Sequence, residues 1–206
     1  MVNTIMEWSK TIQRLFQLAE PYLAARGDKP HVEVAHTYAL SLMEHEGGNN
    51  QIAEPAIILH DVGWSCLEPK QLAAAYGMGL EGKSSNKLNR IHEKEGAAIA
   101  QQILELTGFD APLIDKIIQI IERHDSGRDA HSIEEKIVKD ADKLWRYSEI
   151  GFWYEIERQA LDPNEYYDYL ASRRQTYFFT RTAPTFAKKE LERRFKETRA
   201  LNKKMT

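Results

Sequence analysis

Apolar residues recur at three- and four-residue steps along most of the chain, which is the period of an amphipathic α-helix. Near the amino end, for example, this pattern runs through Ile5, Trp8, Ile12, Leu15 and Phe16. The chain shows no convincing run of the alternating apolar and polar residues that marks a half-buried strand. The sequence therefore predicts an all-α fold, and its length of 206 residues favours a single domain.

Breaks in the apolar pattern divide the chain into separate helices. Pro30 suits the first turn of a helix, and Ser132 with Glu135 forms a capping box at the start of another. The helix at about 51–61 is apolar on all sides, which predicts a central, buried position. The expected helices span about 31–45, 51–61, 69–76, 89–106, 112–123 and 133–148, with others starting at Pro163 and Pro184.

Residues 64–90 differ from the rest of the chain, because they are rich in glycine, serine, asparagine and lysine. One interpretation is a mobile connection that closes over a functional site as a lid. The other is a surface loop with no role in function. The sequence does not decide between the two.

Composition narrows the class of protein. Cys66 is the single cysteine, so no internal disulfide can form and a reducing compartment fits. No apolar run approaches the roughly 20 residues of a membrane span, and the amino end lacks the pattern of a signal peptide. The net charge of −3 is spread over interspersed acids and bases, which makes nucleic acid an unlikely partner. We therefore expect a cytoplasmic protein that needs no membrane, with a homodimer as a possible assembly.

Several apolar helices are expected to end in, or carry, a histidine or an aspartate. Burying such groups is costly unless they have partners, and imidazole and carboxylate together are ligands for Mn, Fe, Zn, Co and Ni. A structural zinc finger is excluded, because it needs several thiolates. Four histidines and two aspartates are enough for two metals with open coordination positions. The six candidate metal ligands are His31, His60, Asp61, His92, His124 and Asp142.

The order and context of these residues resemble a known family. Leu59-His60-Asp61-Val62-Gly63, a histidine 29 residues before His60, and Ala141-Asp142-Lys143-Leu144 are similar to the motifs of the HD superfamily of metal-dependent phosphohydrolases. The resemblance implies a helical bundle in a single domain over 1–206, with its core at about 28–147 and a C-terminal helical extension at 148–206. It also implies that His31, His60, Asp61 and Asp142 bind a metal.

Two further segments resemble the HD proteins that carry extra histidine ligands. These segments are the stretch from His92 to Ala97 and the stretch from Ile121 to His124. The resemblance implies a second metal on His92 and His124, with Asp61 bridging the pair, and a catalytic role for these three residues. The metals are one or two divalent ions per chain, drawn from Mn, Fe, Mg, Co, Ni or Zn.

The resemblance also implies an activity, namely hydrolysis of a nucleotide or other small phosphate ester by a metal-activated water. Two alternatives stay open: a di-iron oxygenase that uses the same six ligands, and a non-catalytic protein that senses a nucleotide or a metal. The chain departs from many HD enzymes at Trp64, which stands where they carry lysine or aspartate. A polar partner for phosphate is therefore expected to come from elsewhere in the chain.

Other charged residues are weaker candidates, and an ordinary surface charge is the simpler interpretation for each of them. His36 lies about 140° around a helix from His31, so we do not expect it in the same site, and we expect Asp140 to face solvent. The candidate general bases are Glu68, Glu93 and Asp125, and the candidate cations for substrate phosphate are Lys83, Lys87, Arg90, Arg123, Arg128 and Lys143.

Overall fold

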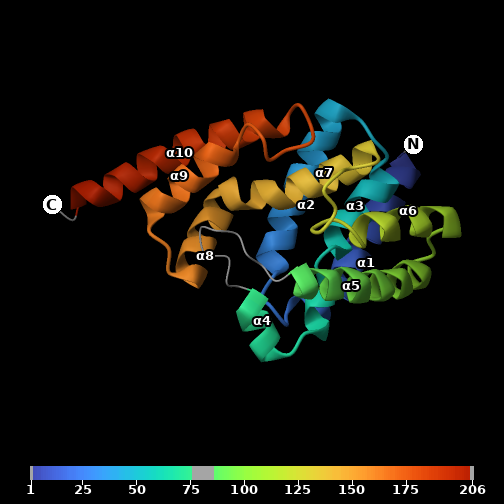
Figure 1. Ribbon diagram of the computed structural model, residues 1–206. Coiled ribbons are helices and arrows are strands. Elements are labelled where there is room, and N and C mark those ends of the chain that lie inside the picture. Colours follow the sequence, from blue (N-terminus) through green and yellow to red (C-terminus); the bar gives the residue numbers. More distant parts are fainter. Residues whose placement is uncertain (1, 76–85, 205–206) are drawn as a thin grey trace.

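The computed structural model describes residues 2–75 and 86–204, and within these ranges it contains ten α-helices and no strand (Figure 1). The all-α prediction is confirmed. None of the helices in these ranges is long and apolar enough to cross a membrane. The helices are α1 (Val2–Leu23), α2 (Lys29–Glu46), α3 (Asn50–Leu59), α4 (Pro69–Ala75), α5 (Asn86–Leu106), α6 (Ala111–Ile121), α7 (Ile133–Leu144), α8 (Glu149–Gln159), α9 (Pro163–Arg173) and α10 (Ala183–Lys204).

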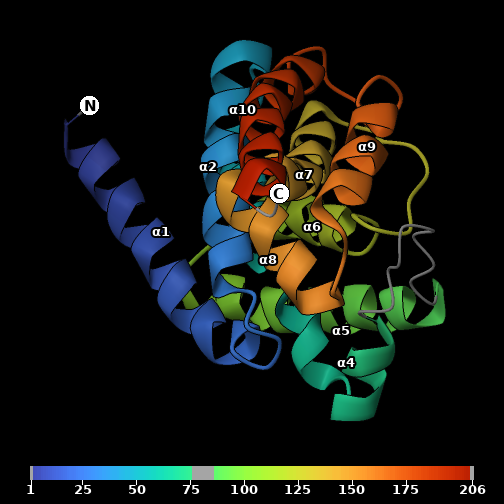
Figure 2. The same ribbon diagram turned by 90° about the vertical axis from the view of Figure 1, so that its left-hand side faces the viewer.

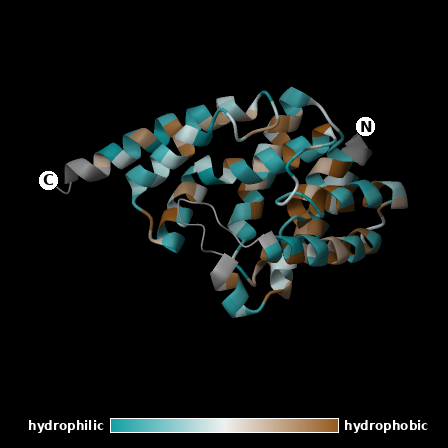
Figure 3. Ribbon diagram, viewed as in Figure 1, coloured by the Kyte–Doolittle hydropathy of each residue, from teal (hydrophilic) through white to brown (hydrophobic). Residues whose placement is uncertain are grey.

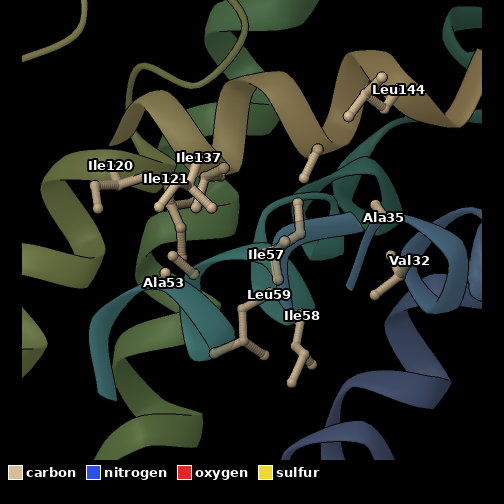
Figure 4. Packing of buried hydrophobic residues seen from close by; sticks show 14 of the residues in the cluster. Val32, Ala35, Ala53, Ile57, Ile58, Leu59, Ile120, Ile121, Ile137 and Leu144 are labelled. Atoms are coloured by element: carbon tan, nitrogen blue, oxygen red, sulfur yellow. The ribbon is translucent and has the colours of Figure 1, made fainter. Parts of the chain in front are cut away.

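Helix α3 is the centre of the bundle. Each of its residues from Ile52 to Leu59 is buried, and the side chain of Asn49 accepts a hydrogen bond from Gln51 N at the helix start. Helices α1, α2, α6 and α7 pack around it, and Figure 4 shows buried side chains of α2, α3, α6 and α7 gathered at this point. In Figure 3, which has the view of Figure 1, hydrophobic residues concentrate where α6 packs against α3 and α5. The prediction that this segment is central is confirmed.

Helix α5 crosses the lower part of the molecule in Figure 2, and it packs on the short 3-10 helix η1 (Val62–Cys66). Two glycines allow this close approach. A methyl group on Gly63 would overlap the carbonyl oxygen of His92 and would lie 2.7 Å from the Cα of Gly96. The backbone of η1 therefore lies directly on that of α5, which brings His92 close to the end of α3.

The C-terminal helices α8, α9 and α10 lie to one side of the bundle, on the left in Figure 1. They follow α7 through the 3-10 helix η2 (Trp145–Tyr147). The sequence did not mark α8 off as a separate helix, although the side chain of Ser148 caps it by accepting a hydrogen bond from Gly151 N. Helix α10 packs against both α9 and α7.

The expectation that Asp140 faces solvent is wrong. Its carboxylate is fully buried and accepts hydrogen bonds from the backbone N–H groups of Phe179 and Thr180 at 2.7–3.0 Å. The carboxylate of Asp140 on α7 thus satisfies two backbone N–H groups of the loop before α10. Because Phe179 is distant in sequence, no local pattern around Asp140 could indicate this contact.

The segment at 64–90 is described only in part. Helix α4 occupies the position expected for a short helix, and η1 precedes it. Lys83 lies outside the described residues, as does most of the glycine-rich part of this segment. The lid interpretation therefore stays a prediction.

Candidate metal centre

The six predicted ligands come from five helices and lie together. His31 is in the first turn of α2, and the pair His60-Asp61 directly follows α3. His92 is in the middle of α5, His124 lies three residues after α6, and Asp142 is near the end of α7. Apart from Asp142, whose side chain is 13% exposed, all of these residues are buried. The described fold thus brings all six side chains to one place.

Four of the side chains form a first cluster. The Nε2 atoms of His31 and His60 are 3.0 Å apart. Asp142 Oδ1 is 3.2 Å from His31 Nε2, and Asp61 Oδ2 lies 3.4 Å from His31 Nε2 and 3.5 Å from His60 Nε2. Two nitrogens bound to one metal at about 2.1 Å, at a right angle, are roughly 3.0 Å apart. The spacing of the two imidazoles therefore fits a shared ion.

A second cluster adjoins the first through Asp61. The Nε2 atoms of His92 and His124 are 3.2 Å apart, and Asp61 Oδ1 lies 3.8 Å and 3.6 Å from them. One oxygen of Asp61 therefore faces each cluster. Asp125 Oδ2, 3.9 Å from His92 Nε2, also belongs here. Sequence reasoning considered Asp125 only as a base, although His124-Asp125 repeats the His-Asp order of His60-Asp61.

Backbone contacts orient two of the imidazoles. His60 Nδ1 donates to the carbonyl of Ile57 at 2.7 Å, and His124 Nδ1 donates to the carbonyl of Ile121 at 2.8 Å. Because a carbonyl can only accept, the proton of each neutral ring sits on Nδ1 and the Nε2 lone pair faces the cluster. This arrangement is the usual support of a metal-bound histidine. The donor set and its orientation thus fit divalent metals.

The electrostatics of the two clusters also favour a cation. Although burial opposes the charged form, Asp61 and Asp142 raise the pKa of His60. Burial likewise opposes the charge on His124, but its contacts with Asp61 and Asp125 raise its pKa to about 9. In both cases neighbouring carboxylates draw positive charge into the centre, where a metal ion would supply it.

Trp64 supports both clusters, which gives a physical role to the residue that departs from many HD enzymes. Its ring stacks on His92 with centroids 3.9 Å apart and an interplanar angle of 10°. Its indole Nε1 donates to Asp61 Oδ1 at 3.0 Å. Arg26 lies over the same indole, 4.4 Å from the ring centroid, and its Nη2 is 4.0 Å from Asp61 Oδ2. Arg26 was not predicted, because it sits in a turn with no motif around it.

The Trp64→Phe variant is expected to bind metal about 10- to 100-fold more weakly at the second cluster, because it keeps the stack on His92 but loses the hydrogen bond that orients Asp61. Metal competition against a chromophoric chelator would measure this. Trp153→Phe is the matched control, since it removes an indole hydrogen bond to Glu197 on α10. Equal affinity in the two variants would contradict the assigned role of Trp64.

The candidate phosphate-binding cations are mostly engaged elsewhere. Arg90 contacts Glu93, the Glu122 carbonyl and Ser126, while Arg123 Nε is 2.9 Å from Glu135. Lys143 Nζ donates to the carbonyl of Tyr177 at 2.8 Å. Lys87 and Arg128 are exposed. Within the described residues, none of these cations has a contact with the six ligands.

Glu93, Glu68 and His36 also lie in identified surroundings. Glu93 is fully buried and accepts hydrogen bonds from Asp125 N, Ser126 N and Ser126 Oγ, so it holds the turn after His124. Glu68 is exposed. His36 pairs with Glu54 at 3.3 Å, away from the two clusters, as expected.

Comparisons with known proteins agree with this arrangement. A family profile described as the HD domain matches residues 31–146, a range that includes all six ligands. Among solved structures, a predicted HD superfamily hydrolase from an uncultured Thermotogales bacterium is 19% identical, with a TM-score of 0.64. The match covers 94% of this chain and 92% of that chain. At this identity the similarity shows the fold alone. Among curated proteins, no significant match is found.

Proposed function

Because this chain belongs to the HD domain family, we propose that it is a metal-dependent phosphohydrolase that acts on a nucleotide or another small phosphate ester. One observation carries the proposal: the two carboxylate oxygens of Asp61 face two separate histidine pairs. A single buried carboxylate between two sets of nitrogen ligands is the arrangement that two neighbouring cations need. Two metals are the usual device for displacement at phosphorus.

The two clusters share Asp61 and otherwise have different ligands. His31, His60, Asp61 and Asp142 would hold one ion, and His92, His124 and Asp61 would hold the other, with Asp125 at its edge. When bound, divalent ions supply a nucleophile from water near neutral pH and neutralise charge that develops on phosphate oxygens.

The chain itself contributes orientation and proton transfer. The carbonyls of Ile57 and Ile121 keep His60 and His124 in the tautomer that binds metal. The indole of Trp64 covers one face of His92 and keeps water from it. We assign Asp125 as the general base and acid, which accepts and returns a proton at Oδ2. Its side chain is 34% exposed, against 7% for Asp61 and 13% for Asp142.

The His124→Ala variant tests this proposal, because it removes one ligand from the second cluster only. We expect close to two metals per chain in the unaltered protein and close to one in the variant, with a loss of phosphate release. Elemental mass spectrometry of protein purified without chelators, followed by a phosphate-release screen with Mn and Fe, would measure both. His45→Ala is the control, since His45 is exposed and contacts the Ser41 carbonyl and the Phe186 ring rather than any of the six candidate ligands.

Two results would count against the proposal. If neither protein bound metal after incubation with Mn, Fe, Co, Ni and Zn, the metal centre itself would be ruled out. If both bound iron and consumed oxygen without releasing phosphate, the chemistry would be that of a di-iron oxygenase.

A further inference from the structure

The carboxyl end of α7 carries a guanidinium close to the metal centre. Arg146 follows Asp142 by four residues, the spacing that puts two helical side chains on the same face. It lies in η2, whose Trp145 packs edge-on against His31 with ring centroids 5.1 Å apart. Because this contact fixes η2 against the first cluster, Arg146 is positioned beside it.

Arg146 differs from several other arginines because none of the described residues forms a hydrogen bond or an ion pair with it. Arg123, Arg158 and Arg194 each pair with a carboxylate at 2.9 Å or less. Arg146, although half-buried, has neither a hydrogen bond nor an ion pair with any residue in the described ranges. Although burial opposes its charged form, the carboxylates of Asp142 and Glu155 favour that form and raise its pKa, but no described residue occupies the hydrogen-bonding fork of the guanidinium. That planar fork matches phosphate oxygens.

The C-terminal extension brings two tyrosines to the same place. Tyr166 is buried, and its hydroxyl has no hydrogen-bond partner among the described residues. Tyr177 is attached to α7, since its carbonyl accepts from Lys143 and the Lys143 Nζ lies 4.8 Å from its ring centroid.

Both tyrosines lie within electrostatic range of Arg146, and Tyr177 also lies within range of Asp142. Burial raises the pKa of Tyr177, Arg146 opposes this rise, and Asp142 adds to it. Burial also raises the pKa of Tyr166, and Arg146 again acts against the rise. One guanidinium and two phenols therefore share a region that adjoins Asp142.

We propose that Arg146, together with the hydroxyls of Tyr166 and Tyr177, forms the subsite that binds the substrate's phosphate beside the metal centre. This inference rests on the proposed phosphohydrolase function and adds to it the residues that recognise the anion. A forked cation and two hydroxyl donors match a group with three terminal oxygens better than a carboxylate with two. The C-terminal extension then completes the active site.

Inorganic phosphate is the probe, and its dissociation constant, measured by calorimetry on the Mn-loaded and on the metal-free protein, is the main readout. Arg146→Ala is expected to weaken phosphate binding by about tenfold to hundredfold, as for loss of a hydrogen bond to a charged group. The phosphate affinity of Arg146→Lys should lie between those of the unaltered protein and Arg146→Ala, because lysine keeps the charge but lacks the forked pair of N–H donors. Arg193→Ala is the matched control, since Arg193 is exposed on α10 and forms an ion pair with Glu190 on the same helix.

Tyr166→Phe gives a second, independent test. The hydroxyl that it removes has no hydrogen-bond partner in the part of the chain that the structure describes, so we expect the thermal midpoint to stay the same or rise. Phosphate affinity should nevertheless fall. A fall in stability with unchanged affinity would show a merely structural tyrosine and would overturn its place in the subsite.

The outcomes separate this inference from the proposed function. If Arg146→Ala binds phosphate as tightly as the unaltered protein, the inference fails, whether or not the protein hydrolyses phosphate esters. If phosphate binding depends on Arg146 but no phosphate ester is hydrolysed, the anion subsite stands and the proposed activity fails. If the Arg193→Ala control weakens binding equally, the binding reflects general surface charge and the inference is overturned.

Discussion

The Asp61→Ala variant is expected to lose metal from both clusters at once. Asp61 is the one residue among the six ligands with an oxygen toward each pair of histidines, at 3.4–3.8 Å from their Nε2 atoms. Its removal leaves each cluster one ligand short and takes away the negative charge that holds the cations. Because loss of a residue that merely orients a ligand costs about 10- to 100-fold in affinity, loss of Asp61 itself should cost more than about 100-fold at each cluster.

The measurement is metal content per chain after dialysis, together with phosphate release and circular dichroism to verify the fold. Asp115→Asn is the control, since Asp115 is an exposed carboxylate on α6. Asp61→Asn keeps the shape of the side chain and isolates the effect of its charge. If Asp61→Ala retained one ion at full occupancy, Asp61 would serve a single cluster and the bridging role would be wrong.

The Gly63→Ala variant is expected to be strongly destabilised. The added methyl would overlap backbone atoms of His92 and Gly96 rather than a flexible side chain, so only a shift of α5 can relieve it. Overpacking typically lowers the free energy of unfolding by about 1–3 kcal/mol and occasionally by more. For Gly63→Ala we expect a loss at the upper end of this range, about 3 kcal/mol. For a chain of this size that corresponds to a fall in the thermal midpoint of roughly 6–12 °C. A shift of α5 would also displace His92, so metal at the second cluster should weaken.

Two other glycines give a graded comparison for the thermal midpoint. A Cβ on Gly96 would lie 3.2 Å from its nearest neighbour, Gly63 N. Gly96→Ala should therefore lower the thermal midpoint less than Gly63→Ala does. Gly108 has open space around it but a φ of 77°, so Gly108→Ala should cost only about 1 kcal/mol of backbone strain. If all three variants lost the same stability, close packing of η1 on α5 would not be the cause.

The sequence allowed prediction of those ligands that carry a local signal. His60 and Asp61 end an apolar helix, and Asp142 interrupts an apolar face. Because burial of such polar groups is costly, the sequence predicted that each of them has a binding partner. Asp125 was missed as a candidate ligand because it was considered as a lone acid. The expectation that Asp140 faces solvent failed for a different reason. Its partners, Phe179 and Thr180, come from a loop after α9, and the period of apolar residues carries no information about contacts between distant segments.

The supporting residues around the clusters were the hardest to foresee. Trp64 differs from the residue that many HD enzymes carry, and its stack on His92 and its hydrogen bond to Asp61 explain what it does. The partners of the candidate phosphate-binding cations were equally hard to predict. Proximity in sequence to a predicted ligand singled out Arg123 and Lys143, whereas the structure engages both with other partners. Helical order fixes the position of each side chain along its own helix, but the choice of neighbour depends on how helices pack.

The spread of the ligands over α2, α3, α5, α6 and α7 has a consequence for the lifetime of the protein. With ions bound as proposed, each ion acts as a crosslink between segments that are far apart in the chain, and it exists only in the folded state. Free metal at a hundredfold excess over its dissociation constant then adds about 2.7 kcal/mol per site to the free energy of unfolding. A chain deprived of metal would unfold and be degraded sooner, so cellular metal supply would set how much of this protein persists.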